Sequence, residues 1–147
     1  MKLKIAWIGK TKDPAIQSLT AEYLKRISRY ADVEGLALAD ESALLKLREK
    51  TASRPAHAIV LLDAHGRQLT SEEFADFLEK HRDRTPQPLV LAVGPADGFS
   101  DGTRKAATAT ISLGKMTLAH ELARVVLLEQ VYRAFTILNR HPYHTGH

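Results

Sequence analysis

The sequence predicts an α/β protein with a parallel sheet and helices on both of its faces. Segments typical of strands alternate with segments of helical periodicity along the whole chain. Two of the strand segments, 57–63 and 89–93, are almost wholly apolar, as expected for strands buried on both faces. The 147 residues fit one domain of roughly 100–200 residues, and no repeat or linker divides them. We therefore expect a single domain over residues 1–147.

The first half of the chain opens with alternating apolar and polar residues that predict a strand. Pro14 lies near the start of a helix whose apolar residues recur every three or four positions. A weaker strand and a short amphipathic helix follow. The expected elements are strand 2–9, helix 14–27, strand 32–38, helix 41–50, strand 57–63 and a turn at 65–67.

The second half begins with a capping signal, in which Thr70 or Ser71 precedes Glu73. After the fourth strand, the Gly- and Asp-rich segment 94–102 predicts a loop. The expected elements are helix 71–82, strand 89–93, a short helix through 104–107, strand 108–113 and a long helix over 118–138.

Composition excludes several kinds of chemistry. The chain has no cysteine, which excludes disulfides, thiolate zinc sites and cysteine nucleophiles. Its formal charge of +4 comes from 21 Lys and Arg against 17 Asp and Glu, a mild surplus that is compatible with a polyanionic partner. No signal peptide or membrane span is apparent, so we expect a cytoplasmic protein that does not enter a membrane.

Several familiar motifs are missing. Lys4 stands where a phosphate loop before Lys10-Thr11 needs a glycine, and neither the dinucleotide fingerprint nor a nucleophile elbow is present. His141 and His144 form a His-x-x-His pair, but no carboxylate or further histidine supports it at metal-ligand spacing. We therefore expect no metal.

Three loops that leave strands carry unusual residues, and ligands of parallel sheets bind at this end of the strands. The loops follow residues 62, 93 and 112. In the second loop, Gly94 and Gly98 either let the backbone approach a ligand or serve a turn that needs positive φ.

The long helix is apolar around nearly its whole circumference. A surface helix needs one apolar face, so we expect this helix to be buried on two sides, the second against another subunit. Its polar residues form two groups, Glu121 with Arg124 and Glu129 with Arg133. These are either surface ion pairs or buried residues that line a site.

The C-terminal segment "GKMTLAHELARVVLLEQVYRAFTILNRHPYH" closely resembles the signature of the RlmH-type (YbeA-like) ribosomal RNA methyltransferases of the SPOUT superfamily. The segments "KIAWIGKTKDPAIQSLTAEYLKRI", "IVLLDAHGRQLTSEEFADFL" and "VGPADGFS" match the same family in the same order. The resemblance implies a C-terminal trefoil knot that binds S-adenosylmethionine. It also implies a homodimer that methylates N3 of a pseudouridine in large-subunit (23S) ribosomal RNA on the assembled ribosome.

The resemblance also assigns site residues by position. Those implied for the cofactor are Leu62, Gly94, Pro95, Gly98, Leu113, Gly114, Lys115, Met116, Thr117 and Leu118. Those implied around the reacting centre are His120, Arg124, Glu129, Tyr132, Tyr143 and His144.

Within this assignment, His144 or His120 is a candidate base for the N3 proton, and Arg124 is a candidate to stabilise the resulting anion. Tyr143 is a candidate to stack on the RNA base. Phosphate contacts are expected from the basic residues Lys2, Lys4, Lys10, Lys12, Lys25, Arg26 and Arg29, unless these form an ordinary solvated face.

The chain departs from the family pattern at two positions. Pro95 stands where the family has a second glycine, and proline offers no N–H to a cofactor. Ala119 replaces a proline before His120. Two alternatives therefore stay open: a knotted RNA-binding dimer without activity, and a SPOUT enzyme acting on transfer RNA.

Overall fold

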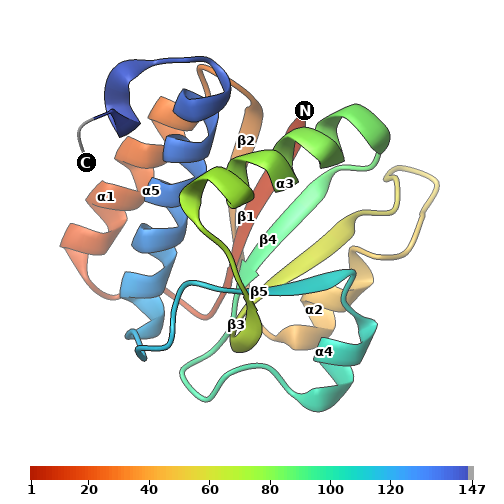
Figure 1. Ribbon diagram of the computed structural model, residues 1–147. Coiled ribbons are helices and arrows are strands. Elements are labelled where there is room, and N and C mark those ends of the chain that lie inside the picture. The colour runs from red at the N-terminus through yellow and green to blue at the C-terminus, as the bar shows by residue number, and fades with distance from the viewer. Residues whose placement is uncertain (146–147) are drawn as a thin grey trace.

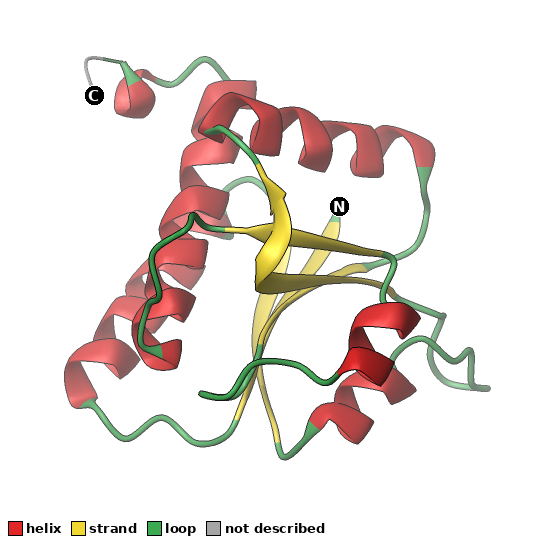
Figure 2. Ribbon diagram, turned by 60° about the horizontal axis from the view of Figure 1, so that its bottom comes forward, coloured by secondary structure: helices red, strands yellow, loops and turns green. Residues whose placement is uncertain are grey.

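A computed structural model describes residues 1–145 as a five-stranded sheet with helices on both faces (Figures 1 and 2). The strand order is β2-β1-β4-β3-β5 and every neighbouring pair is parallel. The predicted fold class is therefore confirmed. The elements are β1 (Lys2–Ile8), α1 (Pro14–Ile27), β2 (Asp32–Leu38), α2 (Glu41–Lys46), β3 (Ala58–Gln68), α3 (Ser71–Arg84), β4 (Leu89–Val93), α4 (Asp101–Ala106), β5 (Ala109–Ser112), α5 (His120–Leu138) and the 3₁₀ helix η1 (Pro142–His144).

Alternate residues of the central strands supply two cores. On one face, Leu3, Val60 and Leu91 belong to a cluster that also includes buried residues of α1, α3 and α5. On the other face, Ala6 and Leu61 belong to a smaller cluster with residues of α2. All five residues of β4 are buried, as its unbroken apolar run predicts.

The helix starts follow the capping signals in the sequence. Asp13 caps α1 by accepting a hydrogen bond of 2.8 Å from the amide of Ala15, and Pro14 occupies the first turn. Thr70, rather than Ser71, caps α3. Its Oγ1 accepts from the amide of Glu73 at 3.0 Å, while Glu73 accepts from the amide of Thr70 at 2.9 Å.

The turn predicted at 65–67 is wrong, because β3 continues through this segment to Gln68. Its pairing with β5 is interrupted between Leu62 and Arg67, so β3 crosses β5 instead of staying in register (Figure 1). A Cβ atom at Gly66 would lie 2.7 Å from the carbonyl carbon of Ile111. Glycine therefore permits a backbone crossing that a side chain would block.

Two predicted helix boundaries also differ. α2 ends at Lys46 instead of residue 50, because the amides of Leu47, Arg48 and Glu49 bond three residues back in tighter turns. α5 begins at His120 instead of Leu118, after Ala119, whose side chain cannot cap the helix.

α5 is buried largely by its own chain. It packs against the sheet, α1 and α3, and buries Leu127, Leu128, Val131 and Phe135 completely or nearly so. The expected burial on two sides is confirmed, but α1 and α3 of the same chain supply most of the cover, so contact with another subunit stays a prediction. Leu122 is the exception, with 46% of its surface exposed.

Candidate active site

The three unusual loops meet in one cavity of about 280 Å³ at the carboxyl ends of β3, β4 and β5. The strand register brings them together, since Leu62 lies opposite both Val93 and Ile111. Nine of the ten residues expected to bind a cofactor line this cavity. They are Leu62, Gly94, Pro95, Gly98, Leu113, Gly114, Met116, Thr117 and Leu118.

The two glycines of the second loop are needed for different reasons. Gly94 packs against the ring of Phe99, which would lie only 3.0 Å from a Cβ atom. Gly98 has φ of +81° and donates its amide to the carbonyl of Pro95 at 2.9 Å, closing a tight turn. Pro95 therefore contributes a carbonyl to the turn and no N–H to the cavity.

The third loop forms an open wall of the cavity. Gly114 has φ of +139°, and its amide donates to Oγ of Ser112 at 3.1 Å. Met116 is 87% exposed although it lines the cavity, so its side chain stands free at the mouth. Among the described residues, the expected Lys115 does not belong to the cavity lining.

Charged residues that the sequence analysis did not select also line this cavity. Asp63 accepts from Nε of Arg104 at 2.9 Å and from the amide of His65 at 2.9 Å. Burial alone would raise the pKa of Asp63, but these two donors together lower it. The available signal was the position of Asp63 directly after the apolar run of residues 58–62, where a carboxylate needs a partner.

A second group of expected residues surrounds η1 and the C-terminal half of α5. The Tyr143 hydroxyl donates to Oε1 of Glu129 at 3.1 Å, and the ring meets Tyr132 edge-on with centroids 4.8 Å apart. Burial and the neighbouring Tyr23 and Glu129 raise the pKa of Tyr143. Glu129 also holds Arg133 in an ion pair of 2.6 Å, and the two side chains are only 21% and 14% exposed, so this ion pair is partly buried and not a surface pair.

Arg124 lies apart from both groups. It is only 2% exposed, with its guanidinium 3.9 Å from the ring centroid of Trp7 and Nη1 2.6 Å from the Thr11 hydroxyl. Burial lowers its pKa. Glu121 instead accepts from the amide of Lys12 at 2.8 Å, so the surface ion pair between Glu121 and Arg124 is not formed.

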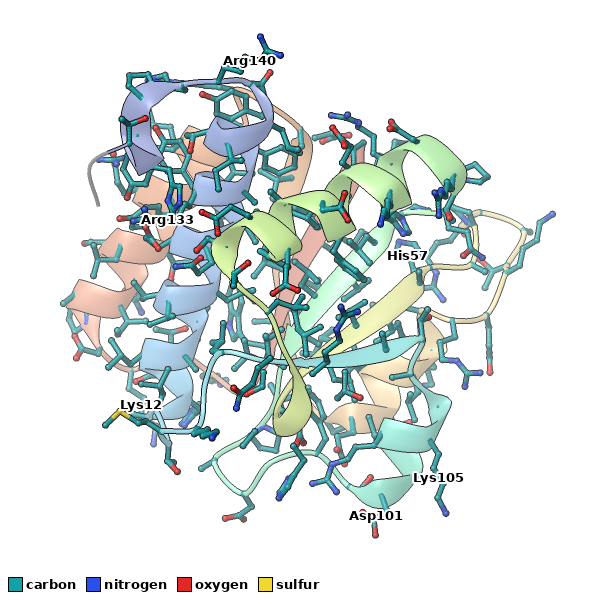
Figure 3. All side chains as sticks on the ribbon, in the orientation of Figure 1. Lys12, His57, Asp101, Lys105, Arg133 and Arg140 are labelled. Atoms are coloured by element: carbon teal, nitrogen blue, oxygen red, sulfur yellow. The ribbon has the colours of Figure 1, made fainter. Side chains whose placement is uncertain are left out.

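The two groups of expected residues are separated along α5. His120 lines the cavity, together with Ala123. Arg133 follows Ala123 by ten residues, which corresponds to about 15 Å along a helix (Figure 3). One chain therefore does not bring Tyr143 and His144 to the cavity.

The basic residues expected to contact phosphate are widely spaced, and two of them are paired with carboxylates. Lys2 begins β1 and Lys10 follows its end, so they lie about 25 Å apart along the strand. Lys4 and Arg26 are already paired, with Glu34 at 3.5 Å and Glu22 at 2.9 Å.

The family model described as "Predicted SPOUT methyltransferase" matches residues 1–144. The chain belongs to this SPOUT family. A Koribacter versatilis protein named ribosomal RNA large subunit methyltransferase H is 58% identical over 147 residues, which are 100% of both chains. A Geobacter sp. (strain M21) protein of the same name is 45% identical over 98% of this chain and 99% of its own.

The SpoU methyltransferase AviRb from Streptomyces viridochromogenes, solved in complex with AdoMet, shares the SPOUT fold. The TM-score is 0.53 at 16% identity, over 90% of this chain and 57% of AviRb. This chain therefore has the knotted SPOUT fold. No described helix is long and apolar enough to cross a membrane, and residues 1–145 contain no metal-holding group of three His, Cys, Asp or Glu.

Proposed function

We propose that this SPOUT protein is a cytoplasmic S-adenosylmethionine-dependent methyltransferase of large-subunit ribosomal RNA. Its substrate is N3 of a pseudouridine in 23S RNA on the assembled ribosome, and it acts as a homodimer. The observation that carries the proposal is the meeting of all three loops in one cavity, in a chain 58% identical over its full length to a ribosomal RNA methyltransferase.

The cavity suits S-adenosylmethionine. Leu62, Val93 and Leu113 supply apolar walls for a flat heterocycle, while the turns at Gly98 and Gly114 leave backbone polar groups near the ligand. A mostly apolar wall with a small number of well-placed polar groups is typical of cofactor sites. The solved relative AviRb holds the same cofactor in its own structure.

The chain must position the RNA base and remove the N3 proton. S-adenosylmethionine supplies the electrophilic methyl group, whose transfer to N3 leaves the sulfur neutral. His120 lines the cavity, so we assign its imidazole to accept the N3 proton. Arg124 lies against Trp7 and Thr11 and does not line the cavity, so we do not assign it to the reacting atoms.

A homodimer completes the site. Tyr143 and His144 do not line the cavity of their own chain and contact Arg133, which is about 15 Å along α5 from the cavity-lining Ala123. A two-fold partner is the simplest source of these groups there. Leu122, next to the cavity-lining Ala123, is exposed and Val126 half-buried, which leaves an apolar stripe on α5 for the partner.

Transfer of labelled methyl to ribosomes from cells lacking the protein tests the proposal. Naked ribosomal RNA and transfer RNA serve as parallel substrates, and His120→Gln serves as the site variant. We expect label on ribosomes only, and a loss of about 10²-fold with the variant. Label on transfer RNA would establish the alternative SPOUT enzyme. Failure to bind S-adenosylmethionine would favour the inactive dimer, and Pro95→Gly then tests the missing amide.

A further inference from the structure

The C-terminal tail is held against its own chain by a continuous set of hydrogen bonds. His144 Nε2 lies 2.7 Å from Oε1 of Glu72, in the first turn of α3. Nδ1 of the same ring lies 2.9 Å from Nη1 of Arg133, which in turn bonds Glu129. Figure 3 shows Arg133 on α5, in the space between α3 and α1. Residues from α3, α5 and η1 thus converge on one imidazole.

These partners fix the tautomer of His144. A guanidinium only donates hydrogen bonds, so Nδ1 must present its lone pair to Arg133. A carboxylate only accepts, so Nε2 must carry the proton that is directed at Glu72. A doubly protonated ring would point an Nδ1–H at the Arg133 N–H across 2.9 Å. The two contacts therefore place a hydrogen on Nε2 and leave the Nδ1 lone pair to accept from Arg133.

This arrangement removes His144 from the candidate bases, because its one lone pair is already engaged. The contribution of the ring is then to hold η1, and with it Tyr143, in a defined place. Glu72 is well placed for this role, since the capping box fixes the first turn of α3 and the helix dipole favours a carboxylate there.

We propose that Glu72 is a positioning residue that acts through His144 to hold the tail for methyl transfer in the partner's site. The proposal rests on the proposed function and deepens it. The Glu72 side chain is 64% exposed, so its bond with His144 adds little to the stability of the fold. Loss of the Glu72 carboxylate should therefore change the hydrogen bonding of the tail and lower kcat, while the unfolding midpoint stays unchanged.

The first readout is the ¹⁵N NMR spectrum of histidine-labelled protein, with the His144 signal assigned by its loss in His144→Gln. We expect the wild-type ring to show one unprotonated Nδ1 and one protonated Nε2. Glu72→Ala should lose this single-tautomer pattern. Glu72→Gln should keep it, because the amide oxygen still accepts from Nε2. Asp76→Ala is the matched control, since Asp76 is a carboxylate one turn further along α3 whose partner is Lys80.

The second readout is steady-state methylation of ribosomes. Glu72→Ala should lower kcat about tenfold, the cost of a misplaced catalytic group. S-adenosylmethionine affinity should stay unchanged, and Glu72→Gln should restore kcat. The proposal is overturned if Glu72→Ala keeps both the tautomer and kcat, or if Glu72→Gln is as impaired as Glu72→Ala. Failure of the proposed function would instead show as an inactive wild type, and the NMR result would still decide the role of Glu72 in the tail.

Discussion

At the crossing of β3 and β5, Gly66 lies so close to the backbone that a Cβ atom would come within 2.8 Å of both Thr110 and Ile111. We expect Gly66→Ala to lower the free energy of unfolding by roughly 1–3 kcal/mol, because backbone atoms cannot rotate away as a side chain can. Gly102→Ala is the control, since the nearest atom there is 4.0 Å away and alanine favours the helix. Urea unfolding of both variants measures the difference; equal stabilities would mean that the crossing relaxes easily.

The lowered pKa of Asp63 predicts that the stability of the fold depends on pH. Its pKa is lowered in the folded chain, so its contribution is present above the unfolded value of about 3.9 and is lost as pH falls through the folded value. Asp63→Asn should therefore be less stable than wild type at neutral pH. The difference in free energy of unfolding between the two proteins should become smaller below about pH 4.

Urea unfolding across this pH range, on wild type, Asp63→Asn, Arg104→Met and the double variant, measures the coupling between the two side chains. A coupling energy of zero at neutral pH would show that the bond of 2.9 Å between Asp63 and Arg104 does not stabilise the fold.

Among the elements, the first turn of α3 contains both the capping box and the residue that bonds the C-terminal tail, Glu72. Thr70→Ala removes the oxygen that accepts from Glu73, so we expect a loss of about 1 kcal/mol. Thr70→Ser keeps that oxygen and should stay near wild type. Thermal or urea unfolding compares the two, and a stable Thr70→Ala would mean that Glu73 alone supports the helix start.

The elements also show what the sequence can and cannot predict. The buried strands β3 and β4, a helix cap at Thr70 or Ser71 and the convergence of three loops follow from apolar runs, capping chemistry and the rule for parallel sheets. The crossing at Gly66 does not, because a glycine after Asp63-Ala64-His65 is equally typical of a turn. Nor does the bond from Glu72 to His144, because residues 72 positions apart are joined only by the tertiary fold.

At the scale of the whole molecule, the exposed Leu122 allows a test of the homodimer. Leu122→Glu places a charge on the apolar stripe of α5, which a single chain tolerates because 46% of the leucine surface is exposed. We expect the wild type to elute as a dimer and the variant as a monomer in size-exclusion chromatography with light scattering. Leu122→Met should remain dimeric, while a monomeric wild type would contradict the proposal.

The cavity is lined by segments on both sides of the strand crossing, with Leu62 and Asp63 before it and Ser112, Leu113, Gly114, Met116, Thr117 and Leu118 at and after the end of β5. A ligand bound there contacts both segments at once, so they cannot move apart while it remains. Occupancy should therefore slow the unthreading of α5 as well as shift the folding equilibrium. Bound S-adenosylmethionine should therefore protect this chain against unfolding to a degree that rises with the occupancy of the site.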